Sequence, residues 1–172
     1  MLGVLLLLAA PKPDLRDIEG RAHALGAKAT VLLFVMADCP ISNSYAPEME
    51  RIRKDYAGKG VAFFIVHADP DTTAAQARKH ARDYALGCPV LLDPRHVLAK
   101  RAGATKAPEA AVLAPETVYR GRIDDAYLDF GKRREKPTRR DLRLALDAVL
   151  AGKKPDKAVA PVIGCDLPDP AK

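Results

Sequence analysis

The sequence predicts one α/β domain in which a mixed β-sheet is flanked by helices and followed by an extended C-terminal tail. The 172 residues suffice for one domain with an ordinary core. Apolar runs typical of buried strands alternate with segments of helical period, the pattern of a sheet covered by helices on both faces. Two strand-like segments close the series as a hairpin, which makes the sheet mixed. We assign residues 11–152 to the domain and residues 153–172 to a Pro-rich tail.

Two apolar runs, at residues 31–36 and 61–66, are the expected central strands. Both are continuous and rich in β-forming residues, which suits strands buried on both faces. Residues 41–56, between them, repeat apolar side chains at steps of four, three and four, the spacing of one helical face. Pro47 lies inside this helix and should kink it.

The following elements are shorter. Either Asp71 or Thr72 can cap the next helix, and residues 89–92 are a short strand. Asp93 should then cap a short helix that has Pro94 at its first position.

The closing hairpin is expected at residues 110–113 and 117–119, joined by a turn that contains Pro115. Thr138 and Asp141 have the spacing of a capping box and precede the apolar periodicity of a last helix.

Residues 1–10 are an apolar run followed by small residues, which we interpret as the remnant of a secretory signal peptide. The basic segment usual before such a run is missing, and a buried first strand is the alternative. The run is too short to cross a bilayer, so we expect no stable membrane span in the mature form. Export to a periplasmic or other extracytoplasmic compartment would allow a disulfide to persist.

The net charge of +6 does not by itself predict an acidic partner. Basic residues are interleaved with acidic ones, and the densest basic run, at residues 132–140, is short. No aromatic residues alternate with it, as a base-stacking surface would require. We therefore expect a solvated face or loop there and no nucleic-acid partner.

Cys39 is the candidate reactive residue among three cysteines. It follows a buried strand and directly precedes a helix, whose free N–H groups and dipole stabilise an anion. A thiol in that position has a lowered pKa and is a better nucleophile. Ser42, three residues on, could donate a hydrogen bond to the sulfur. The alternative for Cys39 is an inert apolar residue, which is our interpretation of Cys88.

The stretch from Phe34 to Ser42 resembles the strand and active-site turn of the thioredoxin-like superfamily, in its Cys-x-x-Ser form. Pro47 matches the helix-kinking proline of thioredoxins, and Pro108 matches the cis-proline that lies against the active-site sulfur. Residues 38–43, with Tyr45 and Glu48, are similar to exported redoxin-domain proteins of the peroxiredoxin and thiol-reductase group, the AhpC/TSA type.

This resemblance covers roughly residues 15–152 and implies a thioredoxin-like fold and a thiol-dependent oxidoreductase without cofactor or metal. Cys39 would be the nucleophile, Ser42 would tune it and Pro108 would shape the substrate groove. Cys165, in the tail, either resolves the mixed disulfide or is a free or intermolecular cysteine. Substrates would be protein or small-molecule thiols, disulfides or peroxides. Because this chain lacks the second active-site cysteine, an electron-transfer partner protein could supply or accept the electrons.

Among the activities that this resemblance implies, peroxide reduction is less favoured than disulfide exchange. Peroxiredoxins have Thr three residues and Pro seven residues before the cysteine, where this chain has Met36 and Leu32. A metal carrier is a further alternative, because Cys39, His67 and Cys165 could supply a soft, copper-like ligand set. Another alternative is a thioredoxin-fold module that is not catalytic, in which the Cys39 thiol undergoes no turnover.

Overall fold

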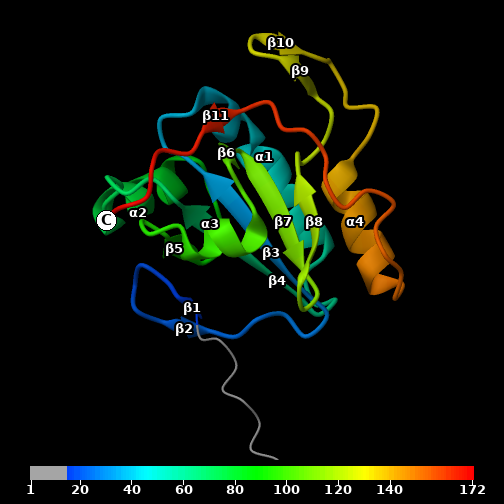
Figure 1. Cartoon of the computed structure of the whole chain (residues 1–172), viewed down its shortest axis with the longest axis horizontal. Coiled ribbons are helices and arrows are strands. Elements are labelled where there is room, and N and C mark those ends of the chain that lie inside the picture. The colour runs from blue at the N-terminus through cyan, green and yellow to red at the C-terminus, as the bar shows by residue number, and fades with distance from the viewer. Residues whose placement is uncertain (1–14) are drawn as a thin grey trace, which may run out of the picture.

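The computed structural model describes residues 15–172, so the signal peptide predicted at residues 1–10 lies outside the described residues. Its centre is a five-stranded sheet with the strand order β5-β4-β3-β7-β8 (Figure 1). The first three of these strands are parallel, and β7 runs antiparallel to both β3 and β8. The strands are β3 (Ala29–Val35), β4 (Val61–His67), β5 (Val90–Leu92), β7 (Glu109–Leu113) and β8 (Thr117–Gly121). The predicted mixed sheet is therefore confirmed.

Helices cover both faces of this sheet. The four helices of the described chain are α1 (Pro40–Asp55), α2 (Ala74–Asp83), α3 (Val97–Ala102) and α4 (Asp141–Leu150). Every residue of β3 is buried, and its side chains alternate between the two faces. Leu33 packs with α1 and α4 in one core cluster, and Phe34 packs with α3 in the other. This is why the β3 sequence is continuously apolar instead of alternating.

Three helix starts differ from the predicted ones. Thr73 caps α2 through a capping box, rather than either of the two residues before it. Asp93 does act as a cap, accepting backbone N–H groups of Val97 and Ala99 at 2.7 and 2.8 Å, but α3 begins at Val97 and not at Pro94. The capping box predicted before α4 does not form, because Thr138 binds a carboxylate far away in sequence instead.

In the described part of the chain, three further strand pairs lie outside the five-stranded sheet. Two are hairpins, β1 (Leu15–Arg16) with β2 (Ala22–His23) and β9 (Tyr127–Asp129) with β10 (Lys132–Arg133). The third pairs β6 (Lys106–Ala107) with β11 (Cys165–Asp166), which belongs to the tail. Among the described residues, the structure contains no helix of the length and apolarity that a membrane crossing needs.

The C-terminal tail, residues 153–172, folds back over the domain and crosses the end of the sheet from the side of α4 toward α2, as the red segment in Figure 1 shows. It is attached to the edge strand β8, where Ala160 N–H donates to the carbonyl of Arg120 at 3.0 Å. Gly121 permits this close approach, since a Cβ there would lie 2.3 Å from the Ala160 carbonyl oxygen. The predicted extended tail is thus an ordered segment that is bonded to the domain.

Candidate active site

Cys39 is the N-cap residue of α1 and follows β3 after a short turn. Its own N–H donates to the carbonyl of Met36 at 3.3 Å, and its carbonyl accepts from the N–H of Asn43 at 3.0 Å. Pro40 starts the helix, where a missing N–H costs nothing. The sulfur therefore lies where the free N–H groups of a 16-residue helix point.

Cys39 and Cys165 form a disulfide, although 126 positions separate them in sequence. Their Cα atoms are 6.2 Å apart. The tail achieves this by pairing β11 with β6, which places Cys165 opposite Ala107. The Cys39 sulfur also lies 3.3 Å from the carbonyl oxygen of Ala107. In the disulfide this is a contact only, whereas the reduced thiol can donate a hydrogen bond there.

Pro108 follows β6 directly, and the bond between Ala107 and Pro108 is cis. Gly164 of the tail packs against the same bend: a Cβ at Gly164 would lie 2.3 Å from the Ala107 carbonyl oxygen and 3.3 Å from Pro108 Cδ. The fold thus brings Cys39, Pro108 and Cys165, three of the four residues predicted from sequence, to one place.

Ser42 does not behave as expected. Its side chain is buried in α1, and its hydroxyl has no hydrogen-bond partner among residues 15–172. The predicted hydrogen bond from Ser42 to the Cys39 sulfur is therefore not formed in the disulfide state. The physical reason is that this sulfur is bonded to Cys165 and lies against the Ala107 carbonyl.

Sequence reasoning missed a buried histidine pair close to the start of α1. His67 ends β4 with none of its surface exposed, and His80 in α2 is also buried. His80 Nδ1 lies 3.3 Å from His67 Nε2, and His80 Nε2 lies 2.8 Å from the side-chain oxygen of Asn43. Asn43 Nδ2 donates to the carbonyl of Ala37 at 2.9 Å, just before Cys39.

The direction of these bonds fixes both tautomers. The Asn43 oxygen can only accept, so His80 donates from Nε2 and its Nδ1 accepts from His67 Nε2–H. His67 Nδ1 is then an unprotonated nitrogen, and it has no partner among the described residues. Burial, with the nearby His80, lowers the pKa of His67 to about 4, and burial also lowers the pKa of His80.

The copper-like ligand set considered from sequence is not assembled. His67 pairs with His80, while both other candidate ligands are consumed by the disulfide. Within residues 15–172, no three His, Cys, Asp or Glu side chains are grouped so that they could hold a metal ion.

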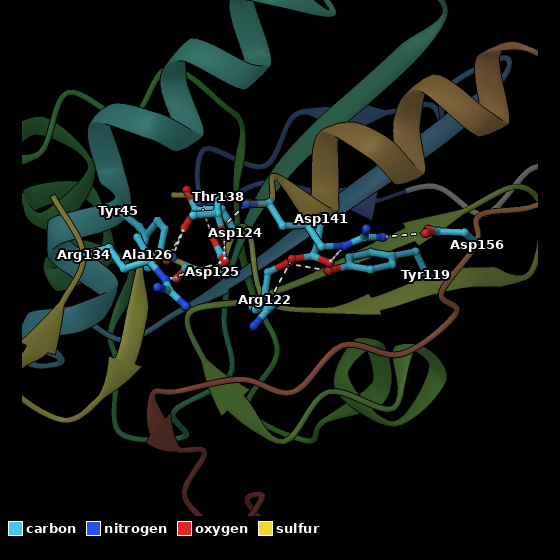
Figure 2. A network of polar contacts seen from close by, with 11 residues as sticks. Tyr45, Tyr119, Arg122, Asp124, Asp125, Ala126, Arg134, Thr138, Asp141 and Asp156 are labelled. Carbon is cyan, nitrogen blue, oxygen red and sulfur yellow. Dashed lines mark hydrogen bonds and ion pairs between the residues drawn. The ribbon is translucent and has the colours of Figure 1, made fainter. Parts of the chain in front are cut away.

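A network of buried carboxylates and their hydrogen-bond partners connects α1, the segment after β8 and the start of α4 (Figure 2). Tyr45 donates its hydroxyl to Asp124 at 2.6 Å, and burial together with that carboxylate raises the pKa of Tyr45. Burial alone would raise the pKa of Asp125, but hydrogen bonds from Thr138 and the backbone lower it to about 2. Asp141, at the start of α4, accepts from two arginines at 2.7 Å each.

Both acids that follow β8, Asp124 and Asp125, are buried, and neither pairs with Arg120 or Arg122. Arg122 binds Asp141 instead. The acids join α1, the segment after β8, and α4, so they hold the active-site helix in place.

Cys88 is the free cysteine of the chain and is buried. Burial raises the pKa of its thiol to about 12. This agrees with the structural role expected from its position just before β5.

Comparisons with known proteins point to one group. The AhpC/TSA family model matches residues 9–122. A hypothetical protein from Sinorhizobium meliloti 1021 shares 29% identity with a TM-score of 0.77, and the match covers 92% of this chain and 91% of that one. An uncharacterized conserved protein from Geobacillus kaustophilus shares 27% identity with a TM-score of 0.76, over 93% and 91% of the two chains.

A secreted disulfide oxidoreductase from Mycobacterium tuberculosis has a TM-score of 0.53 at 17% identity, and the match covers 82% of this chain and 96% of that one. A search of curated proteins gives no match. The solution structure of a putative thioredoxin from Neisseria meningitidis matches with a TM-score of 0.62 at 21% identity, over 83% of this chain and 89% of that one, which confirms the thioredoxin-like fold expected from the sequence.

Proposed function

The chain belongs to the AhpC/TSA family, and from that premise we propose that it is an exported thiol-disulfide oxidoreductase with Cys39 and Cys165 as its redox pair. The disulfide between these residues carries the proposal. A cysteine at a helix N-terminus, joined to a second, partly exposed cysteine in the tail, has the parts that disulfide exchange needs: a stabilised thiolate and a resolving thiol.

The exchange starts from the reduced protein. The Cys39 thiolate attacks one sulfur of a substrate disulfide, and the other substrate sulfur leaves as a thiolate and takes up a proton. The Cys165 thiolate then attacks the Cys39 sulfur, so that the first substrate sulfur is released as well. Two electrons have passed from the cysteine pair to the substrate, and the protein holds the disulfide described above.

A dithiol reductant restores the reduced form. Cys39 is buried within the disulfide whereas Cys165 is partly exposed, so the incoming thiolate attacks Cys165. Cys39 then leaves as the thiolate that the start of α1 stabilises, and a stabilised leaving group departs faster. The second thiol of the reductant completes its own disulfide and frees Cys165.

Export is part of the proposal. It is supported by the apolar run at residues 1–10, by an intramolecular disulfide that an oxidising compartment preserves, and by the secreted oxidoreductase from Mycobacterium tuberculosis that shares the fold.

The test is reduction of insulin disulfides by the purified full chain with dithiothreitol as electron donor. Cys39→Ser should lose the activity. Cys165→Ser, reduced and then freed of dithiothreitol, should accumulate a mixed disulfide with insulin that mass spectrometry detects. Cys88→Ser is the matched control and should keep wild-type activity, because this thiol is buried and outside the site. Full activity of Cys39→Ser would overturn the proposal.

A further inference from the structure

The tail covers a strand edge that lies directly beside the reactive sulfur. Among the described residues, β6 pairs with β11 and with no other strand. The register sets Cys165 opposite Ala107 and Asp166 opposite Lys106, and the N–H of Leu167 donates to the Thr105 carbonyl at 2.9 Å. Removal of the tail would leave these backbone groups unpaired, and an unpaired edge is a template for another extended chain.

The backbone of this edge is also held by a residue outside the tail. Glu109, a buried residue of β7, accepts the backbone N–H groups of Thr105 and Lys106 at 2.8 and 3.0 Å. These two bonds hold the backbone just before and within β6 from the side of the main sheet. Neither bond involves a residue of the tail, so both can persist when β11 leaves β6.

The tail has attachments on both sides of Cys165, so only the short segment around this cysteine needs to leave β6 once the disulfide opens. After Cys165, Leu167 packs against the core, and the N–H of Ala171 donates to the Pro94 carbonyl at 2.7 Å. Lys106 forms an ion pair with Asp166, but the Asp166 side chain is 82% exposed, and exposed pairs contribute little. Before Cys165, the tail is attached at Ala160, on the edge of β8. Only residues 161–164 separate that anchor from Cys165, so the freed cysteine stays near Cys39 at a high effective concentration.

We propose that Gly164, Cys165 and Asp166 occupy the place of a substrate segment, so that the protein acts on disulfides of extended polypeptides whose cysteine follows glycine and precedes an acidic residue. This inference rests on the proposed redox function. The substrate segment pairs with β6 as β11 does, its cysteine takes the place of Cys165, and Lys106 is the specificity-determining residue for the position after it.

Resolution and release then become one event. In the mixed disulfide the substrate segment lies on β6 and its sulfur is bonded to Cys39. When Cys165 attacks the Cys39 sulfur, the bond to the substrate sulfur breaks, and the tail needs the same edge that the substrate holds. The return of β11 therefore displaces the reduced substrate as its thiol leaves.

Two features set the preferred sequence. Any residue other than glycine in the Gly164 position would place its Cβ 2.3 Å from the Ala107 carbonyl oxygen, so glycine is favoured before the cysteine. Lys106 offers a positive charge to the residue after it, so Asp is favoured there over Lys. The charge preference should weaken at high salt, because the pair is exposed.

The experiment uses the full chain with Cys88→Ser and Cys165→Ser, in which Cys39 is the remaining thiol. Peptides of eight or so residues that contain Gly-Cys-Asp, Gly-Cys-Lys or Val-Cys-Asp are prepared as mixed disulfides with thionitrobenzoate. Attack by Cys39 on the peptide sulfur releases the coloured thionitrobenzoate anion, whose absorbance gives the rate. Lys106→Glu and the matched control Lys100→Glu, an exposed charge reversal on α3, are made in the same background.

Gly-Cys-Asp should react about fivefold faster than Gly-Cys-Lys, the size expected of an exposed charge contact, and at least about tenfold faster than Val-Cys-Asp. Lys106→Glu should reverse the Asp-to-Lys ratio, and Lys100→Glu should leave that ratio as it is. Equal rates for the three peptides, or a ratio that Lys106→Glu does not move, would overturn the inference. Failure of Cys39 to react even with the small symmetric disulfide of thionitrobenzoate would instead refute the proposed function.

Discussion

The buried His67 side chain should make the folded protein lose stability as the pH falls from 6.5 to about 4. In the folded state the pKa of His67 is lowered from 6.5 to about 4, because burial and the neighbouring His80 oppose its charge while Asp69 favours it only weakly. The unfolded chain takes up this proton near pH 6.5, so between the two values it binds more protons than the folded chain, and acid favours unfolding. Above pH 6.5 the full contribution is present.

The magnitude follows from the size of the shift. One unit of pKa corresponds to about 1.4 kcal/mol, so a fall from 6.5 to about 4 corresponds to roughly 3 kcal/mol of unfolding free energy when the pH reaches 4. His67 has no exposed surface, so solvent does not screen this effect. A loss of this size is a large fraction of the stability of an ordinary domain.

The assay is urea unfolding of the oxidised protein at several pH values between 7.5 and 4, compared with His67→Gln. The glutamine amide can still donate a hydrogen bond toward His80 but does not titrate. Stability of the wild type should fall by roughly 3 kcal/mol more than that of the variant over this interval. Carboxylates that titrate in the same range affect both proteins equally and cancel. Parallel pH dependences for the two proteins would show that His67 is not held neutral by the fold.

Three other outcomes are expected. Cys88 should resist alkylation at pH 8 in the native protein, because burial raises the pKa of its thiol to about 12, and should react on unfolding in urea; mass spectrometry of the labelled chain decides this. Tyr45→Phe should cost about 1 to 3 kcal/mol in urea unfolding, because the buried Asp124 carboxylate loses a 2.6 Å hydrogen bond. Gly121→Val should loosen the attachment of the tail at Ala160, because the new Cβ would meet the Ala160 carbonyl oxygen. The disulfide between Cys39 and Cys165 should then become about tenfold easier to reduce in a glutathione titration. An unchanged midpoint of that titration would contradict this prediction.

The sheet and its helices were predictable from the sequence because their signals are local. The continuous apolar runs at residues 31–36 and 61–66 need no partner to be recognised, and the structure places β3 and β4 there. The helix spacing at residues 41–56 is equally local and gives α1. The location of Cys39 between such a strand and such a helix then follows from the chain order, since the two elements meet at the end of β3.

What the sequence could not reveal depends on contacts between distant residues. Thr138 has the spacing of a helix cap, yet it binds Asp125, 13 residues earlier, because that buried carboxylate needs donors more than the helix needs a side-chain cap. His67 and His80 are likewise 13 positions apart on a strand and a helix, without any spacing that marks a pair. Polar residues of this kind are judged exposed from sequence, and only the tertiary structure shows how burial is compensated.

The docking of the tail is a different case, because its signal is present in the sequence but is not periodic. The two-residue strand β11 is too short to show any pattern, which is why the partner of Cys165 stayed open. The tail nevertheless crosses the domain at two glycines, Gly121 on the sheet and Gly164 in the tail, and a Cβ at either would lie 2.3 Å from a backbone oxygen. One glycine makes the anchor possible and the other lets the segment before Cys165 lie against β6. The path of the tail is therefore specified by where side chains are missing, and the same missing side chain at Gly164 sets the shape that a competing substrate must match.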